Sequence, residues 1–296
     1  METLQVTKIE RAETIEALNR SEIDIQISTA KKYPRDITLS VSRIAALATV
    51  NEEVAEECFY SLRRQGKSGE SVINGPSVRL AEIVAQNWGN LRAQAQIISN
   101  DGKFIVARGI CHDLETNYAV SVEVQRRICD KYGKPFSDDM QVVTSNAAAA
   151  IAYRNAVFKV VPMSLLSGAV EQIKEKANGE TENLPEVRQK MLKYYAGIGV
   201  TEPMILSFLG IGTVDEIDSK MVSELRGIKN AIKEHDTTPE EQFINPYREK
   251  EKQKTANRQQ AATAGKVAQA MAKQKASPEP AGAQEAADDM PIFQQQ

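Results

Sequence analysis

Apolar and polar side chains alternate along residues 91–97, 103–111 and 118–125. This period of two is typical of strands that bury one face. Asp101-Gly102 is a favoured pair for a tight hairpin turn, and the polar segment 113–117 turns the chain a second time. The pattern therefore predicts a three-stranded antiparallel β-meander.

Apolar residues at helical spacing lie on both sides of this meander. One or two helices are predicted within 38–60 and another over 78–87, just after Gly75-Pro76-Ser77. After the meander, residues 144–161 form an alanine-rich helix that stops at Pro162, and its small side chains let it lie close to the sheet. The predicted fold class is α+β: helices plus a three-stranded antiparallel meander followed by a long helix, a β-β-β-α core, then a small helical domain and a disordered tail.

Polar breaks and shifts of composition divide the chain into five parts. From residue 245 onward large apolar residues are almost absent, so this segment cannot offset its ordering entropy. The predicted parts are a mobile N-terminal arm with a short helix or strand (1–34), an α+β core (35–177), a linker (178–184), a small helical C-terminal domain (185–244) and a disordered tail that is basic and then acidic (245–296).

Composition narrows the classes of function. The 296 residues carry a net charge of -3, so nucleic-acid binding would have to come from local patches. No apolar run approaches the roughly 20 residues that span a bilayer, which predicts a soluble, cytoplasmic protein. Three cysteines without metal-ligand spacing and two histidines give no pattern for a zinc site or a histidine-based triad, so no cofactor is predicted.

The segment SLRRQGKSGE, residues 61–70, resembles a nucleotide-phosphate loop because Gly66-Lys67-Ser68 closes the G-x-x-x-x-G-K-[ST] pattern. Ser61, however, stands where that pattern has its first glycine, and the preceding residues read as a helix instead of a buried strand. We expect a flexible basic loop in which Arg63, Arg64 and Lys67 contact the phosphates of a polymer instead of a nucleotide.

Further cations and aromatic residues could complete such a surface. The additional candidate backbone contacts are Arg79, Arg126, Arg127, Lys131 and Lys134, followed by Arg154 and Lys159. Arg154 could equally be a buried ion-pair partner, and the other cations could simply be solvated. Base stacking could use Trp88, Tyr118, Tyr132 or Tyr153, for each of which a core role is the alternative.

Several phrases of the sequence carry a family resemblance. The GPSVRLAE helix, the DLETN turn, the Arg126-Arg127 exit from the meander and the helix AAAAIAYRNAVFKVVP resemble the core of phage single-strand annealing recombinases over roughly residues 35–170. That superfamily includes Red-beta, RecT and Erf and is similar to the eukaryotic Rad-type annealing proteins. The resemblance implies a homo-oligomeric ring or filament, located in the host cytosol, that binds single-stranded DNA in a basic groove and anneals complementary strands without ATP; Mg²⁺ is possible but not required.

The last residues suggest a partner contact. Asp288 and Asp289 precede Ile292 and Phe293, and acids followed by apolar residues suit a basic-rimmed apolar pocket on a partner. The phrase DDMPIF is similar to the acidic tip of bacterial single-strand binding proteins, with Met and Pro transposed and three glutamines added. Candidate partners are host replication or recombination proteins or a phage exonuclease.

Two other classes of function remain open. One is an oligomeric adaptor or scaffold of a replication-recombination complex. The other is an enzyme, either an ATPase using Gly66-Lys67-Ser68 or a Mg²⁺-dependent nuclease using Asp101, Asp113, Asp138 and Asp139.

Overall fold

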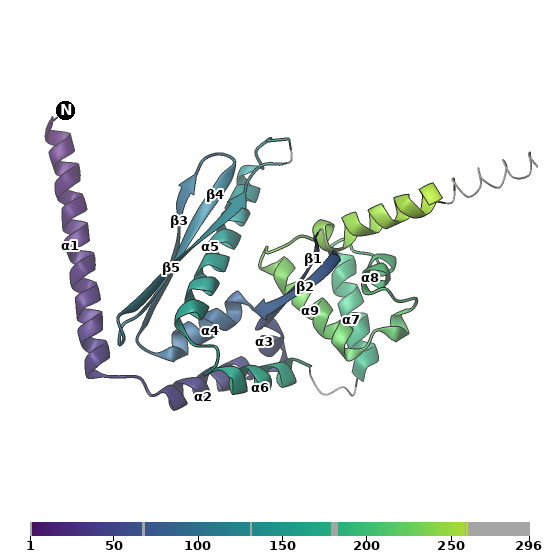
Figure 1. Ribbon diagram of the computed structural model, residues 1–296, viewed down its shortest axis with the longest axis horizontal. Helices are drawn as coiled ribbons and strands as arrows, with labels where there is room; N and C mark the ends of the chain where they lie inside the picture. Colours follow the sequence, from purple (N-terminus) through teal and green to yellow (C-terminus); the bar gives the residue numbers. More distant parts are fainter. Residues whose placement is uncertain (1, 67–68, 131, 179–182, 258, 260–296) are drawn as a thin grey trace, which may run out of the picture. The chain divides into compact units, whose positions relative to one another are not determined.

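The computed structural model describes residues 2–66, 69–130, 132–178, 183–257 and 259. The fold is α+β, and the chain divides into two compact units, Met1–Tyr247 and Arg248–Gln296. Within the described residues the elements (Figure 1) are α1 (Glu2–Lys32), α2 (Ile37–Ala48), α3 (Glu52–Glu57), β1 (Phe59–Gly66), β2 (Gly69–Pro76), α4 (Val78–Trp88), β3 (Leu91–Asn100), β4 (Phe104–Asp113), β5 (Tyr118–Arg127), α5 (Asp138–Val160), α6 (Ser167–Asn178), α7 (Leu184–Gly197), α8 (Glu202–Leu209), η2 (Val214–Glu216), α9 (Ser219–Lys233) and the π-helix η3 (Glu240–Ile244).

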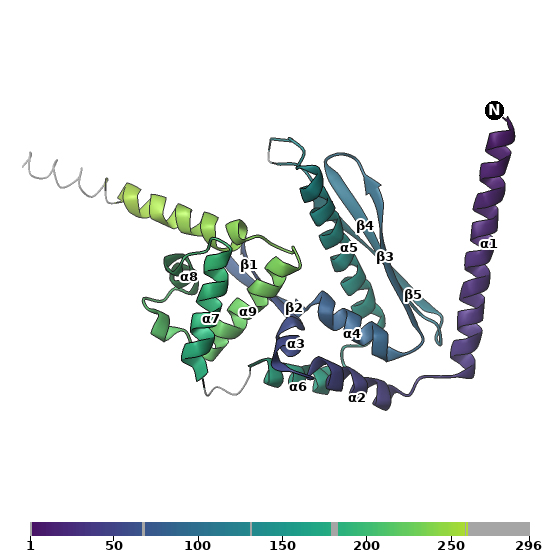
Figure 2. The same cartoon turned by 180° about the vertical axis from the view of Figure 1, so that it is seen from behind.

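The predicted meander is confirmed. Strands β3, β4 and β5 form an antiparallel sheet in that order, and α5 packs along one face of it (Figure 2). Gly109 sets the distance between them, because a Cβ at this position would lie 2.1 Å from the carbonyl oxygen of Ala152. Ala148 and Ala152 are fully buried at this contact, so the alanine-rich helix does lie close to the sheet.

A helical layer completes the main core beside α5. α2, α4 and α6 supply Ile44, Leu80, Val84 and Ile173, which pack with Val157 of α5. N-cap side chains stabilise the starts of α2 and α4: Asp36 and Ser77 accept hydrogen bonds from the backbone amides of Leu39 and Leu80. α2 and α4 thus lie where the apolar periodicity predicts helices, whereas α6 was not predicted and α5 begins before the predicted residue 144.

The basic segment around residue 64 is not the expected loop. β1 and β2 form an antiparallel hairpin in which Gly66 pairs with Gly69, and residues 67 and 68 lie outside the described part of the chain. β1 packs against α9, where a Cβ on Gly227 would lie 2.6 Å from the Cβ of Ser61. The prediction of a loop was wrong because this hairpin is stabilised by a helix distant in the sequence.

The N-terminal arm also differs from its prediction. Residues 2–32 form the single helix α1 instead of a short helix or strand. Near its end, Ile23 and Ile27 are half-buried and Ala30 is buried, which is the spacing of one helix face. Arg92 of β3 donates hydrogen bonds to Glu22 and Gln26 and so holds this part of α1 beside the sheet.

The C-terminal helices have a small core of their own. Tyr195, Ile205, Leu225 and Phe243 are fully buried there, as the prediction of a compact helical region requires. This region nevertheless belongs to the same compact unit as the sheet.

The second unit is described only at its beginning. Residues 248–257 and 259 are helical, whereas a disordered tail was predicted from 245. The remainder of the predicted tail lies outside the described residues. In the part of the chain that the structure describes, no helix is both long and apolar enough to cross a bilayer.

Candidate nucleic-acid interface

One face of the meander points away from α5. Alternate β4 residues are buried, from Ile105 to Asp113, so Phe104, Arg108 and His112 lie on the opposite face. The register places Gln96 and Glu123 on either side of Arg108, and Arg108 forms a 2.8 Å ion pair with Glu123. The central strand therefore presents both apolar and charged side chains on this outer face, since Val106 and Ile110 lie there as well.

Cations and aromatic side chains gather at one end of the sheet. Register pairing puts Phe104 beside Arg127, and the amide of Ile128 donates to the carbonyl of Lys103. The Arg127 guanidinium lies 5.4 Å from the centre of the Phe104 ring. Lys134 and Tyr132 follow in the next loop, both exposed. We call this group the sheet-end cluster: Lys103, Phe104, Arg127, Tyr132 and Lys134.

The loop that carries Tyr132 and Lys134 has a defined shape. The Asp130 carboxylate accepts hydrogen bonds from the amides of Tyr132 and Lys134 at 2.8 and 2.9 Å. Gly133 has φ +85°, a conformation that glycine adopts readily, and Cys129 forms a β-bridge with Pro135. This local turn chemistry holds Lys134 at the end of the sheet.

Two of the four predicted contact residues between 126 and 134 belong to this cluster. Arg127 and Lys134 belong to the cluster, while Lys131 lies outside the described residues. Arg126 points to the α5 side of the sheet, where it donates to the backbone carbonyl of Asp236 at 3.3 Å and remains partly exposed. Lys103 was missed, although its place directly after the Asp-Gly turn puts it beside the strand that ends at Arg127.

Arg154 is a buried ion-pair partner, which is the role that the sequence left open as the alternative to a DNA contact. Its side chain is 9% exposed and lies 3.0 Å from the Asp236 carboxylate. Its guanidinium also stacks 4.5 Å from the centre of the Tyr60 ring. A phosphate could reach Arg154 only if this packing opened.

Arg63 is also engaged inside the protein. Two of its nitrogens contact the Glu224 carboxylate, at 2.6 and 3.0 Å, and its guanidinium lies 3.9 Å from the centre of the Phe208 ring. Because Arg63 is on β1 and both partners are on the C-terminal helices, the pair fastens the hairpin to that region. The geometry favours a structural role for Arg63 over the predicted phosphate contact.

The remaining predicted cations are on separate elements. Arg64 is exposed on β1, Arg79 lies 3.5 Å from Glu82 on α4, and Lys159 is exposed in the last turn of α5. Lys67 and the tail residues Asp288, Asp289, Ile292 and Phe293 lie outside the described residues. The sheet-end cluster does not include these residues, and their contacts with DNA stay predictions.

The predicted stacking residues divide between core and surface. Trp88 is 3% exposed and Tyr153 packs against the main core, so neither presents a ring to a base. Tyr118 is 54% exposed and Tyr132 is 83% exposed. Of these two, Tyr132 is the one that shares a loop with a described cation, Lys134.

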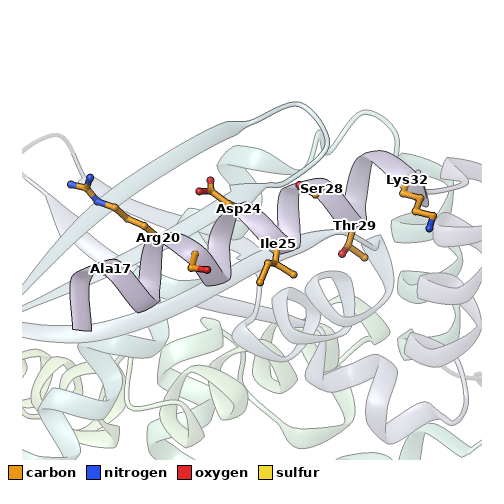
Figure 3. Close-up of a pocket in the computed structure, with 8 residues that line it drawn as sticks. Ala17, Arg20, Asp24, Ile25, Ser28, Thr29 and Lys32 are labelled. Atoms are coloured by element: carbon orange, nitrogen blue, oxygen red, sulfur yellow. The ribbon is translucent and has the colours of Figure 1, made fainter. Parts of the chain in front are cut away.

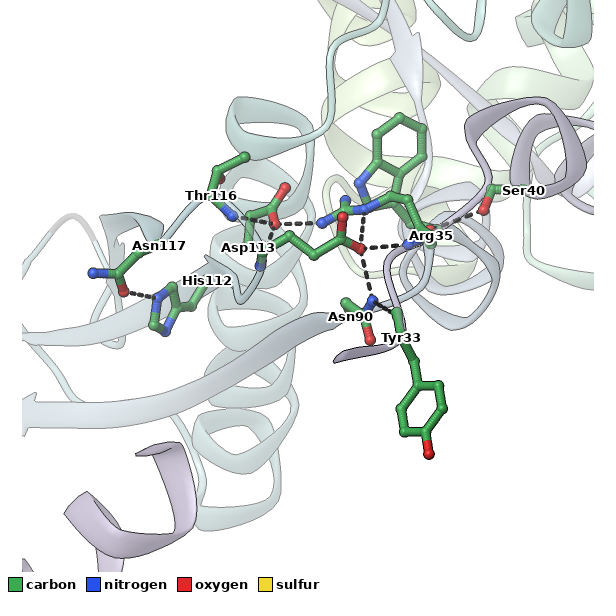
Figure 4. Close-up of polar contacts among 10 residues, drawn as sticks. Tyr33, Arg35, Ser40, Asn90, His112, Asp113, Thr116 and Asn117 are labelled. Carbon is green, nitrogen blue, oxygen red and sulfur yellow. Dashed lines mark hydrogen bonds and ion pairs between the residues drawn. The ribbon is translucent and has the colours of Figure 1, made fainter. Parts of the chain in front are cut away.

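A polar network lies at the opposite end of the sheet (Figure 4). Arg35 forms ion pairs with Asp113 and Glu115, and Asn90 donates to Glu115 at 2.6 Å. Burial alone would raise the pKa of Glu115, but the hydrogen bonds from Asn90 and Arg35 lower it. The network ties the connection between α1 and α2 to the β4–β5 turn, with Arg35 shared between two carboxylates.

The candidate enzymatic residues that the structure describes lie on separate elements, with Asp138 and Asp139 together at the start of α5. Gly66 ends a hairpin strand, not the strand–loop–helix unit of a phosphate loop. Asp101 and Asp113 lie near opposite ends of β4, about 30 Å apart by strand rise. Among the described residues, no group of three His, Cys, Asp or Glu side chains could hold a metal ion. Burial raises the pKa of Cys58 and Cys111 to about 12, which keeps both thiols protonated at neutral pH.

A shallow depression follows α1 (Figure 3), lined by Ala17, Arg20, Ser21, Asp24, Ile25, Ser28, Thr29 and Lys32. All of these residues come from one helix. The depression therefore has no opposing wall and cannot enclose a small ligand.

Comparison with known proteins does not assign a family. No protein-family model, curated protein or solved structure matches this chain. The function must therefore be argued from the geometry and chemistry of its surface.

Proposed function

We propose that the protein binds single-stranded DNA and anneals complementary strands without ATP. The observation that carries the proposal is the sheet-end cluster, in which the exposed cations Lys103, Arg127 and Lys134 lie at the same end of the sheet as Phe104 and Tyr132. Lys103, Arg127 and Lys134 form no salt bridge with any described residue. They are therefore available to an external anion.

The chemistry of this cluster suits a single strand. Nonspecific single-strand binding combines cations that follow the phosphates with aromatic rings on which bases stack. Tyr132 is 83% exposed and shares its loop with Lys134, and the backbone of Lys103 bonds to that of Ile128 where the loop begins. Contacts to phosphates and to one ring leave the hydrogen-bonding edges of the bases open for pairing.

Assembly is part of the proposal. β3 and β5 are the two edges of their sheet, so each has backbone groups without a partner strand in the described chain. We propose a homo-oligomer, a ring or filament as in the family that the sequence resembles, which would align several sheet-end clusters along one strand. ATP and a resident cofactor are not needed for this activity.

The first experiment measures annealing of two complementary labelled oligonucleotides without nucleotide, with and without Mg²⁺. Binding of single-stranded and duplex DNA is measured in parallel over a salt series. Fast annealing without ATP and a preference for single strands are expected. Self-association without single-strand binding would instead favour an adaptor or scaffold, and strand loss only with Mg²⁺ would favour a nuclease.

The variant Lys103→Ala, Arg127→Ala, Lys134→Ala tests the cluster. Three lost phosphate contacts should reduce the magnitude of the slope of log K against log salt by about 2 for single strands. The matched control is Arg43→Ala, Lys176→Ala, Lys190→Ala, which removes the same charge from exposed sites on α2, α6 and α7. Equal slopes for the two triple variants would place the DNA site elsewhere.

A further inference from the structure

A second concave site lies between the β1–β2 hairpin, α6 and α9. It is a cavity of about 580 Å³, within the range of sites that bind ligands or side chains. Its apolar lining includes Phe59, Val72, Pro76, Met163, Val170 and Ala177. The sheet-end cluster contributes no residue to it.

Two glycines shape the walls of the cavity. A Cβ on Gly75 would lie 2.9 Å from the Tyr60 ring, so glycine leaves room for that ring. Gly227 lets α9 meet β1 at Ser61. Inside, the Ser61 hydroxyl donates to the Asn74 side-chain oxygen at 2.6 Å, so these polar groups satisfy each other. The surface left to an occupant is mainly apolar.

The charge of the cavity is positive. Glu224 is among the lining residues, but Arg63 neutralises it in the ion pair described above. Lys174 and Lys220 are exposed lining residues, from α6 and α9 respectively. An occupant should therefore combine bulky apolar side chains with negative charge.

The chain itself contains a segment with this chemistry. Residues 260–296 lie outside the described part of the chain, and within them Asp288 and Asp289 directly precede Met290-Pro291-Ile292-Phe293. We propose that the cavity binds the 288–293 segment of a second copy of the chain. Ile292 and Phe293 fill the apolar cavity, and the two aspartates face Lys174 and Lys220.

This contact differs from an interface between like surfaces. Each copy offers one cavity and one segment, so the contact is heterologous and can link copies in series. The inference does not depend on DNA binding. Loss of annealing and loss of this contact are therefore separately observable.

The first test uses a fluorescent peptide of residues 284–296 and the full chain carrying Ile292→Ala and Phe293→Ala, whose own segment cannot compete. We expect saturable binding that weakens at least tenfold when Lys174→Glu and Lys220→Glu are added. The control Lys176→Glu, Lys190→Glu changes the same charge outside the cavity lining and should bind as before. No binding, or equal loss in both charge variants, would overturn the proposal.

A second test identifies which copy is bound. A photoreactive phenylalanine replaces Ile292 in one full-length chain, which is mixed with a tagged full-length chain carrying Ile292→Ala and Phe293→Ala. Cross-links from the photoreactive chain to α6, α9 or the hairpin of the tagged copy are expected. Cross-links confined to the photoreactive chain itself, at any protein concentration, would overturn the assignment to a second copy.

Discussion

Glu234 is a buried carboxyl with incomplete hydrogen bonding. Its Oε2 has no hydrogen-bond partner among the described residues. Burial, followed by the charge of Asp236, raises its pKa from 4.5 to about 7, despite hydrogen bonds from the amides of Val78 and Arg79 and the charge of Arg154. The folded protein thus holds this proton more tightly than the unfolded chain does.

Replacing Glu234 with Gln should stabilise the protein in a pH-dependent manner. Ionised Glu234 lowers the free energy of unfolding, and this destabilisation grows as pH rises from 4.5 to about 7. Glu234→Gln should therefore raise the free energy of unfolding by roughly 1–3 kcal/mol at pH 8 and by much less at pH 5. Denaturant titrations at both pH values measure this, with Glu186→Gln at an exposed site as the control. An identical effect at the two pH values would contradict the argument.

The contact of α5 with β4 depends on a glycine. Gly109→Ala would place a methyl group 2.1 Å from a backbone oxygen of α5, so the backbone of α5 or of β4 would have to shift. We expect a loss of about 3 kcal/mol in the free energy of unfolding. Gly168→Ala is the control, because its added Cβ meets nothing within 4 Å. Equal thermal midpoints for the two variants would show that the helix is not held so closely.

Elements with a clear period could be predicted from the sequence, and elements held by distant partners could not. The meander and the alanine-rich helix follow from local pattern and side-chain size. The β1–β2 hairpin is basic and glycine-rich, and the helix that covers it begins at Ser219. The full length of helix α1 was missed because, within residues 17–32, its half-buried face rests on a few positions near Ile23 and Ile27.

The residues of the candidate site divide in the same way, into those that local pattern predicts and those whose partners are distant in the sequence. Arg127 and Lys134 were predicted from the exit of the last strand, and strand pairing adds Lys103. Arg63 and Arg154 look alike as isolated cations in a sequence. Their partners Glu224 and Asp236 lie 161 and 82 residues away, so the ion pairs had no local signal.

At the scale of the whole molecule, the hairpin and α9 join two hydrophobic cores. Trp88 belongs to the main core and Tyr195 to the core of the C-terminal helices. Between them, the Asn230 side chain donates to the carbonyls of Glu56 and Phe59, and Arg226 forms a 2.9 Å ion pair with Glu56. We expect residues up to 247 to unfold as one cooperative unit.

Gly227→Val tests this cooperativity. The added side chain would press on the backbone of β1, far along the chain from Trp88, the only tryptophan. Thermal unfolding followed by tryptophan fluorescence and by far-UV circular dichroism should shift downward together. Gly197→Ala, which meets nothing within 4 Å, should leave both transitions unchanged. A fluorescence transition that stays at its original temperature while the dichroism transition moves would mean two independent domains.

The position of the hairpin also affects how the chain folds as it leaves the ribosome. Gln242 bonds both backbone groups of Arg63, which precedes it by 179 residues. Synthesis proceeds at about 5–20 residues per second, so β1 waits on the order of ten seconds or more for these partners. During that interval β1 and β2 emerge without the helices that cover them. Folding of the first unit is therefore completed after, and not during, synthesis of the meander, and a chain interrupted before α9 would leave the hairpin open to aggregation or proteolysis.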